Sequence, residues 1–470
     1  MKKYRLLLPL FFTASGCAPY VPMRLQDDVQ HSYESRSLNN QEVLNFITKY
    51  SPENNQRKTW DLNKLTLAAF YYSPNLELSR AERDTSTAAL TTAENGPNPV
   101  FSWLPQFVSN AHGAPTWAQG FNLDLGIETA GKKELRIETA TFLESAKKAA
   151  ILETAWLIRN HIRDALLLVQ KAKENIALIK EEQAILKDDS NYKSQKINSG
   201  ETSSLVVLDT NSLLLKNEFA LKDASYQLLE AKLALADAVS VPLAAVNSIT
   251  LDCSAVEKLE IIPEDFLSYS KEYALKHRSD ILTALATYNA ADSAYKLELA
   301  NQYPDLHLSP NYTWDQGAHK WGLSFTGTQN DNAGPILETQ SKRKEAAIKF
   351  LTLQEQVISD IDSSVILYKS ALDKVSVAKN VVSSQDAQNK KIFELLRPGD
   401  VTRAIYLRSK LNLISVKNLK LDATFQAATL KGKLESVLEQ SIGDNFSIDA
   451  KTIENSPKDN TDNSSQVGEQ

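Results

Sequence analysis

Hydrophobic side chains recur at alternating spacings of four and three residues along the stretch from 151 to 179. A mean period of 3.5 residues is typical of the buried seam of a left-handed coiled coil. A helix running from about Gly131 to Tyr192 would be on the order of 90 Å long at 1.5 Å per residue. The pattern therefore predicts a helix much longer than those of ordinary globular domains. The seam positions are Ile151, Ala155, Ile158, Ile162, Ala165, Val169, Ala172, Ile176 and Ile179.

Three further stretches, 214–238, 358–382 and 407–428, carry similar spacings. They predict a second long helix and two return helices, so that each long helix forms a coiled-coil hairpin. This periodicity alone fits a solvent-exposed scaffold equally well. The positions are Leu214, Leu221, Ala224, Leu228, Ala231, Leu235, Ala238, Ile358, Ile361, Val365, Tyr368, Leu372, Val375, Val382, Leu407, Leu411, Ile414, Leu421, Phe425 and Ala428.

Four short segments show the other period, in which apolar and polar residues alternate. They lie near 100–108, 117–128, 305–315 and 319–327, and the first is the least regular. Such segments are typical of membrane barrel strands, although a sheet on a soluble core also alternates. Four strands cannot close a barrel and an open edge is unstable in lipid, so several copies of the chain would have to contribute. We expect four side chains to face lipid: Leu308, Trp314, Trp321 and Phe325.

The chain repeats its plan. "SGETSSLVVLDTNSLLLK" (199–216) and "PGDVTRAIYLRSKLNLISVK" (398–417) each place a Gly and an acid before a Leu-rich run. We interpret 60–239 and 266–441 as two copies of helix, two strands, long helix, tip and return helix, joined by an equatorial linker at 240–265. Gly200 and Gly399 would end the long helices, because a left-handed conformation costs Gly little. Glu201 and Asp400 follow them at matching positions.

The first residues have the layout of a secretory signal peptide, with basic residues, a short apolar run and small residues. The string "ASGC" resembles a bacterial lipobox, with Ala14 where a Leu is usual, and Cys17 would then carry the lipid, including palmitate. An ordinary signal peptide with an incidental Cys is the alternative. We therefore predict a signal peptide at 1–16, an extended segment at 17–59 and a disordered polar tail at 442–470.

Composition excludes several classes of function. The net charge of −6 gives no reason to expect nucleic-acid binding. Once a signal peptide is removed and Cys17 is set aside, Cys253 is the remaining cysteine, so no intramolecular disulfide is expected. The six histidines are scattered without metal-ligand spacing, and no nucleophile elbow or phosphate loop occurs. We expect no enzyme activity, no metal site and no cofactor.

The doubled order of "YYSPNLELSRAERDTSTAALTTAENGPNPVFSW", "SGETSSLVVLD", "HRSDILTALATYNAADSAYKLELANQYPDLHLSP" and "RPGDVTRAIYL" resembles the TolC-like outer-membrane efflux protein family over roughly 60–441. The string "IETAGKKELRI" is most similar to the heavy-metal cation branch. The resemblance implies a mainly α fold with a small membrane β part, in which long coiled coils form a periplasmic α-barrel. It also implies a homotrimer whose four strands per chain make a twelve-stranded β-barrel.

The same resemblance implies an exit duct in the bacterial outer membrane, lipid-anchored and largely periplasmic. Its partners would be a periplasmic adaptor (membrane fusion) protein, an inner-membrane pump and outer-membrane lipid. Docking is expected at the tips, near Gly200, Glu201, Gly399 and Asp400. Asp209 and Arg408 occupy matched positions with opposite charges and form a candidate gate pair between alternate neighbours around the tube. The exit duct of a type I secretion system and a lipid-anchored periplasmic scaffold are the alternatives.

Overall fold

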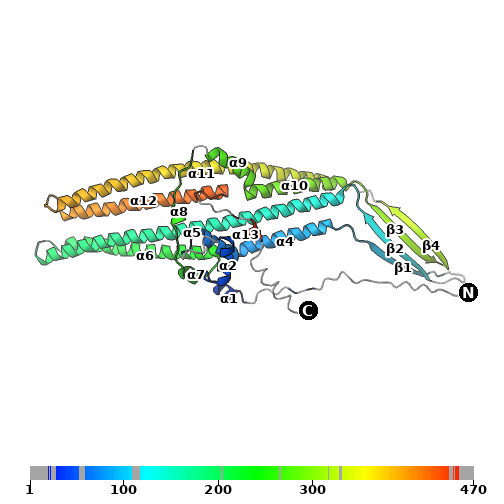
Figure 1. Ribbon diagram of the computed structural model, residues 1–470, viewed down its shortest axis with the longest axis horizontal. Helices are drawn as coiled ribbons and strands as arrows, with labels where there is room; N and C mark the ends of the chain where they lie inside the picture. The colour runs from blue at the N-terminus through cyan, green and yellow to red at the C-terminus, as the bar shows by residue number, and fades with distance from the viewer. Residues whose placement is uncertain are drawn as a thin grey trace.

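The computed structural model describes residues 28–51, 59–107, 117–201, 205–263, 266–315, 317–327, 331–443 and 450–454, with the single residues Tyr20, Pro22, Ser109, Ser203 and Ile448. The molecule is elongated: two helical hairpins extend to one end, and a sheet projects from the other (Figure 1). Shorter helices gather around the middle of the long ones. We call this middle part the equatorial layer.

The same order of elements occurs twice. In the first half, α3 (Leu62–Tyr72) and α4 (Pro74–Glu94) precede β1 (Val100–Phe107), β2 (Trp117–Ile127), α5 (Lys132–Asn198) and α6 (Leu205–Val239). In the second half, α9 (Phe266–His277) and α10 (Ser279–Ala300) precede β3 (Leu306–Asp315), β4 (Ala318–Thr326), α11 (Ala333–Leu396) and α12 (Arg403–Leu438). With 67 residues, α5 is about 100 Å long at 1.5 Å per residue.

The heptad positions named above form the seams of the two hairpins. α5 packs along α6, and α11 packs along α12 (Figure 1). All of those positions are buried or half-buried, which confirms the coiled-coil expectation. The largest cluster of buried side chains lies in the equatorial layer, where α3 and the linker pack against α5. The hairpins are therefore anchored at the middle and extend as thin arms towards their tips.

All four strands join in one antiparallel sheet in the order β1-β2-β3-β4. The central pair joins the halves, with Phe121 opposite Tyr312. β1 and β4 are the edge strands of this sheet. Pro105 lies in the edge strand β1, where prolines of a sheet are commonly found because they have no N–H group to donate to a neighbouring strand. Figure 1 shows no helix against either face of this sheet. Among the described residues, no helix is both long enough and apolar enough to cross a membrane.

Two of the expected irregular segments contain helices, so those predictions are wrong for these residues. In 17–59, expected to be extended, α1 (Val29–Glu34) and α2 (Gln41–Tyr50) begin at the N-caps Asp28 and Asn40. α2 forms because Val43 and Ile47, one turn apart, are buried together.

In the tail expected to be disordered, α13 (Ala450–Glu454) packs against α5, and Ile453 is buried. Arg80 and Arg83 of α4 donate hydrogen bonds to the carbonyl groups of Ile453 and Glu454. These contacts hold the segment because they satisfy its backbone while its apolar side chain enters the core. The linker also contains two short helices, α7 (Leu243–Asn247) and α8 (Ser254–Glu257).

Candidate channel wall and helix tips

One face of the sheet is apolar and aromatic. Trp321 is 82% exposed and Phe325 is 71% exposed, whereas Leu308 and Trp314 on the same face are half-buried by their neighbours. Aromatic rings cross all four strands on this face, with centroids 6.2, 6.3 and 4.6 Å apart along the series Phe101, Phe121, Tyr312 and Trp321. The four residues expected to face lipid thus share one face, and no described helix covers it.

The opposite face is polar. His307 and Ser309 both contact Asp124 of the neighbouring strand, at 3.0 Å from the imidazole Nδ1 and 2.9 Å from the hydroxyl group. Asn311 and Ser324 lie on this face as well. The alternation in the sequence therefore separates the two faces along most of each strand, as a strand period of two requires.

Ion pairs fasten the sheet to the long helices. Lys132, at the start of α5, lies 2.8 Å from Asp305 and donates a second hydrogen bond to the carbonyl group of Tyr303. Burial raises the pKa of Asp305, but hydrogen bonds from Lys132 and from the N–H of Thr129 outweigh it and hold the pKa below its ordinary value. Because Lys132 belongs to the first half and Asp305 to the second, this contact also joins the halves.

At the far end of the molecule, α5 stops at a glycine. Gly200 has a φ of +75°, in the left-handed region. Its N–H donates to the carbonyl group of Ile197, and the N–H of Glu201 donates to that of Lys196, both at 2.9 Å. This is the Schellman pattern that satisfies the last carbonyl groups of a helix.

The second tip is built in the same way. Gly399 has a φ of +89°, and its N–H donates to the carbonyl group of Leu396 at 3.3 Å. The N–H of Asp400 donates to the carbonyl group of Leu395 at 3.1 Å. At both tips the backbone of the acid thus helps to end the preceding helix.

The two acidic side chains differ. Glu201 forms an ion pair with Lys196 and accepts a hydrogen bond from Ser199, and these contacts lower its pKa. Asp400 is exposed, and the described residues offer its carboxylate no hydrogen bond or ion pair. At the second tip Leu395 replaces Lys196. The matched positions therefore carry unequal effective charges.

The candidate gate pair is not joined within the chain. Asp209 on α6 and Arg408 on α12 are both exposed, and no ion pair connects them among the described residues. Instead, a ladder of solvent-accessible ion pairs connects α5 with α12 and so bridges the two hairpins: Arg403–Asp188 at 2.7 Å, Lys417–Glu181 at 2.8 Å and Lys171–Asp422 at 3.0 Å. The sequence shows acidic and basic residues on both predicted helices, but it does not show which of them form pairs.

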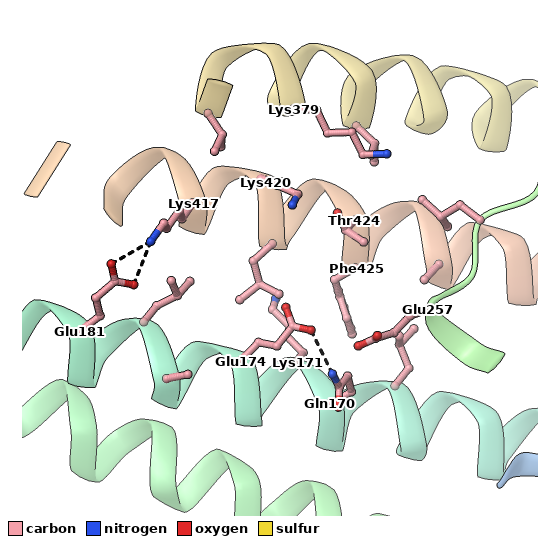
Figure 2. A pocket seen from close by; sticks show the side chains of 18 residues that line it. Gln170, Lys171, Glu174, Glu181, Glu257, Lys379, Lys417, Lys420, Thr424 and Phe425 are labelled. Carbon is pink, nitrogen blue, oxygen red and sulfur yellow. Dashed lines mark hydrogen bonds and ion pairs between the residues drawn. The ribbon is translucent and has the colours of Figure 1, made fainter. Parts of the chain in front are cut away.

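Beside this ladder lies an open cavity of about 700 Å³ between α5, α11 and α12 (Figure 2). Its wall mixes apolar side chains such as Phe425 with lysines and glutamates. Glu257 of the linker also lines it. Among the residues that the structure describes, no group of three or more His, Cys, Asp or Glu side chains could hold a metal ion.

A buried ionic cluster joins the halves in the equatorial layer. Arg163 of α5 lies 3.2 Å from Glu435 of α12, and both side chains are almost fully buried. Lys431 approaches the same carboxylate at 3.7 Å. A Cβ atom on Gly432 would lie 1.5 Å from the guanidinium group of Arg163, so a larger residue there would have to displace that group from its present position. Breaking such a pair typically costs about 3–5 kcal/mol, far more than an exposed pair.

The predicted lipid site, Cys17, lies outside the described residues.

Comparison of the sequence with protein-family models gives no match, and comparison with curated proteins gives none.

Solved structures give clear matches. The Campylobacter jejuni CmeC outer membrane channel has a TM-score of 0.67 at 15% identity, covering 94% of this chain and 97% of its own. The Vibrio cholerae outer membrane protein VceC has 0.67 at 16%, covering 81% and 96%. CusC, described as forming a transmembrane channel, has 0.68 at 12%, covering 82% and 94%. The chain therefore has the fold of the TolC-like outer-membrane channels.

Proposed function

We propose that this chain is the outer-membrane exit duct of a tripartite efflux system and works as a homotrimer. Four strands from each of three chains would form a twelve-stranded β-barrel, and the helical hairpins would form a periplasmic α-barrel below it. A periplasmic adaptor and an inner-membrane pump would deliver the substrate. Lipid on Cys17 would add an anchor.

The observation that carries this proposal is the uncovered apolar face of the sheet. A soluble sheet buries such a face against helices or a second sheet. Here Trp321, Phe325, Trp103, Phe101 and Phe107 are all exposed, and no described helix lies over them. Lipid outside and water inside would satisfy the apolar and polar faces together. The same observation disfavours the periplasmic scaffold, which has no use for an exposed aromatic sheet.

A second observation supports assembly from several copies. α6 carries a row of exposed apolar side chains at heptad-like spacings of seven, four, seven, three and four residues. It lies beside the seam that α6 shares with α5, and no helix among the described residues covers it. Exposed seams of this kind are buried against another helix in coiled coils. The row is Leu208, Leu215, Phe219, Tyr226, Leu229 and Leu233.

Conductance of the purified protein across planar lipid bilayers tests the duct. We expect stepwise channels from detergent-solubilised particles with the mass of three chains. A protein that is monomeric and soluble without detergent, and that leaves bilayers sealed, would instead support the scaffold. Crosslinking at the tips near Gly200 and Gly399, followed by identification of the captured pump complex, separates efflux from type I secretion.

A further inference from the structure

Two glutamates meet where the linker returns to the long helix. Cys253 and Val256, at the start of α8, are buried in the equatorial core. One position further, Glu257 is half-buried and faces Glu174 of α5. Figure 2 shows their two carboxyl groups directed towards each other. Gln170 donates a hydrogen bond of 3.0 Å to Glu174, so it supports one of the two carboxyl groups.

The cations around this pair are engaged elsewhere or lie on open surface. On α5, Lys171 pairs with Asp422, and Lys173 is exposed. On α12 and α11, Lys420 and Lys379 are exposed and line the same cavity. In the linker, Lys258 pairs with Glu260, and Asp252 adds a further negative charge nearby. Within the described residues, no lysine forms an ion pair with Glu174 or Glu257.

Two carboxyl groups in contact without a cation are most stable when they share a proton. Burial raises the pKa of Glu257, and the hydrogen bond and charge of Glu174 raise it further, whereas Gln170 lowers it slightly. A carboxyl group with a raised pKa in the docked state binds its proton more tightly there than when released. Docking of α8 is therefore fully favoured below the ordinary glutamate pKa and weakens as the pH rises through the raised value.

We propose that Glu174 and Glu257 form a proton-dependent fastening, which holds the linker on the long helix at low pH and loosens it at higher pH. α8 contacts both α5 and α12, so the fastening acts on both halves of the chain. It does not depend on whether the chain conducts. If the proposed duct opens by moving one hairpin against the other, the protonated state would resist that movement.

Cys253 provides a natural probe of the docked state. It is buried, and burial raises the pKa of its thiol to about 11, so alkylation requires release of the segment. We would alkylate the full-length protein with N-ethylmaleimide at pH 5.5 and pH 8 and follow Cys253 separately from Cys17 by peptide mass spectrometry. Glu257→Gln and Glu174→Gln imitate the protonated acid and should remain docked at both pH values.

At pH 8, Cys253 of the wild type should react several-fold faster than in either glutamine variant, because two ionised carboxylates in contact repel each other and release the segment. At pH 5.5 the difference between the wild type and the variants should be smaller, because more of the wild type carries the shared proton. A direct effect on the thiol would act in the opposite direction. Removing the charge of Glu257 would lower the pKa of Cys253, so Cys253 would be alkylated faster in Glu257→Gln than in the wild type. The rate ratio at each pH therefore separates the fastening from a direct effect on the thiol.

Glu181→Gln is the matched control, because Glu181 lines the same cavity from the same helix but pairs with Lys417. It should react like the wild type at both pH values. Equal ratios at pH 5.5 and 8, or faster alkylation of Glu257→Gln, would overturn the proposal. Hydrogen exchange of the α8 amides in the wild type gives a test without variants. Protection corrected for the intrinsic rate must fall between pH 5.5 and 8, and constant protection would also overturn it.

Discussion

At the scale of single residues, the side-chain period of the strands decides which side chains would face lipid in the proposed barrel. Leu323 is exposed on the aromatic face near the middle of β4, and Ser324 beside it is on the polar face. Leu308 is only the third residue of β3, nearer the helical end. This parity was predictable from the sequence because a period of two is local. The depth of each residue was not, because it depends on the register between strands.

The first prediction follows from this parity. Leu323→Arg should lower the free energy of unfolding in lipid vesicles by about 2–4 kcal/mol, because a charge would face the bilayer near its midplane. Ser324→Arg should have a much smaller effect. Leu308→Arg should cost less than Leu323→Arg but more than His307→Arg, its neighbour on the polar face. Urea unfolding of the reconstituted protein measures all four, and equal tolerance at Leu323 and Ser324 would argue for a soluble sheet.

The second prediction concerns Cys17. If this residue is lipidated, Cys17→Ser should abolish metabolic labelling of the protein with palmitate. The protein should still reach the outer membrane fraction, because in the proposed barrel the apolar face of the sheet would bind lipid by itself. Labelling that persists in the variant would rule out Cys17 as the lipid site.

At the scale of elements, the long helices and their return helices could be predicted, but the contacts between the two hairpins could not. A heptad pattern can be recognised in the sequence of one helix alone. The apolar positions in 151–179 therefore indicate which side chains are buried, whichever helix packs against them. The ion pair between Arg403 and Asp188 depends on which helix α12 packs against, and many exposed acids are available to a flexible arginine. In contrast, α2 could have been recognised locally, since Asn40 is a good N-cap ahead of an amphipathic turn. The helix α13 depends on contacts with Arg80 and lacked any such local pattern.

The third prediction distinguishes the two tip acids. Asp400→Gln should lower cation selectivity, measured as the reversal potential in a KCl gradient, because its carboxylate is uncompensated. Glu201→Gln should change selectivity much less, since Lys196 already balances Glu201. Neither variant should change trimer yield, because both acids end their helices through backbone N–H groups. Equal shifts from both variants would show that the ion pair at Glu201 does not matter for passage.

At the scale of the whole molecule, the single chain leaves surfaces uncovered that further copies would cover in the proposed trimer. The edge strands β1 and β4 each have a side without a neighbouring strand. The row of apolar side chains on α6 is exposed as well. The sequence indicated that several copies are needed, but it did not show which helix face carries the contact. The row on α6, with Phe219 its most exposed member at 77%, is the face that we propose for this contact.

The fourth prediction is that Phe219→Glu weakens the trimer. Placing a charge in a seam removes apolar burial of about 1.5–3 kcal/mol per contact and adds a desolvation cost. Lys216→Glu, at an exposed polar position on the same helix, is the control for a change of charge alone. Mass measurement of the detergent particle should show a loss of trimer for Phe219→Glu only. An intact trimer would place the contact on another face.

The last prediction asks what keeps the tips together. The equatorial layer joins the halves through the buried pair Arg163–Glu435, whereas nearer the tips they are joined by the exposed ladder of α5–α12 ion pairs. Exposed pairs contribute about 0.2–1 kcal/mol each and weaken with salt, so the tips are the part of the molecule that separates most easily. Arg403→Glu should raise the open probability in bilayers several-fold by setting like charges against Asp188.

The charge swap Arg403→Glu with Asp188→Arg provides the decisive control, because it restores an ion pair with reversed polarity. It should return the open probability towards that of the wild type, while each single variant stays more open. Arg408→Asp tests the other candidate, in which Arg408 pairs with Asp209 of a neighbouring chain, and a raised conductance there would add that pair to the gate. If the swap conducts like the single variants, Arg403 holds the tip through its contact with the ring of Tyr192, 4.3 Å away, and not through charge.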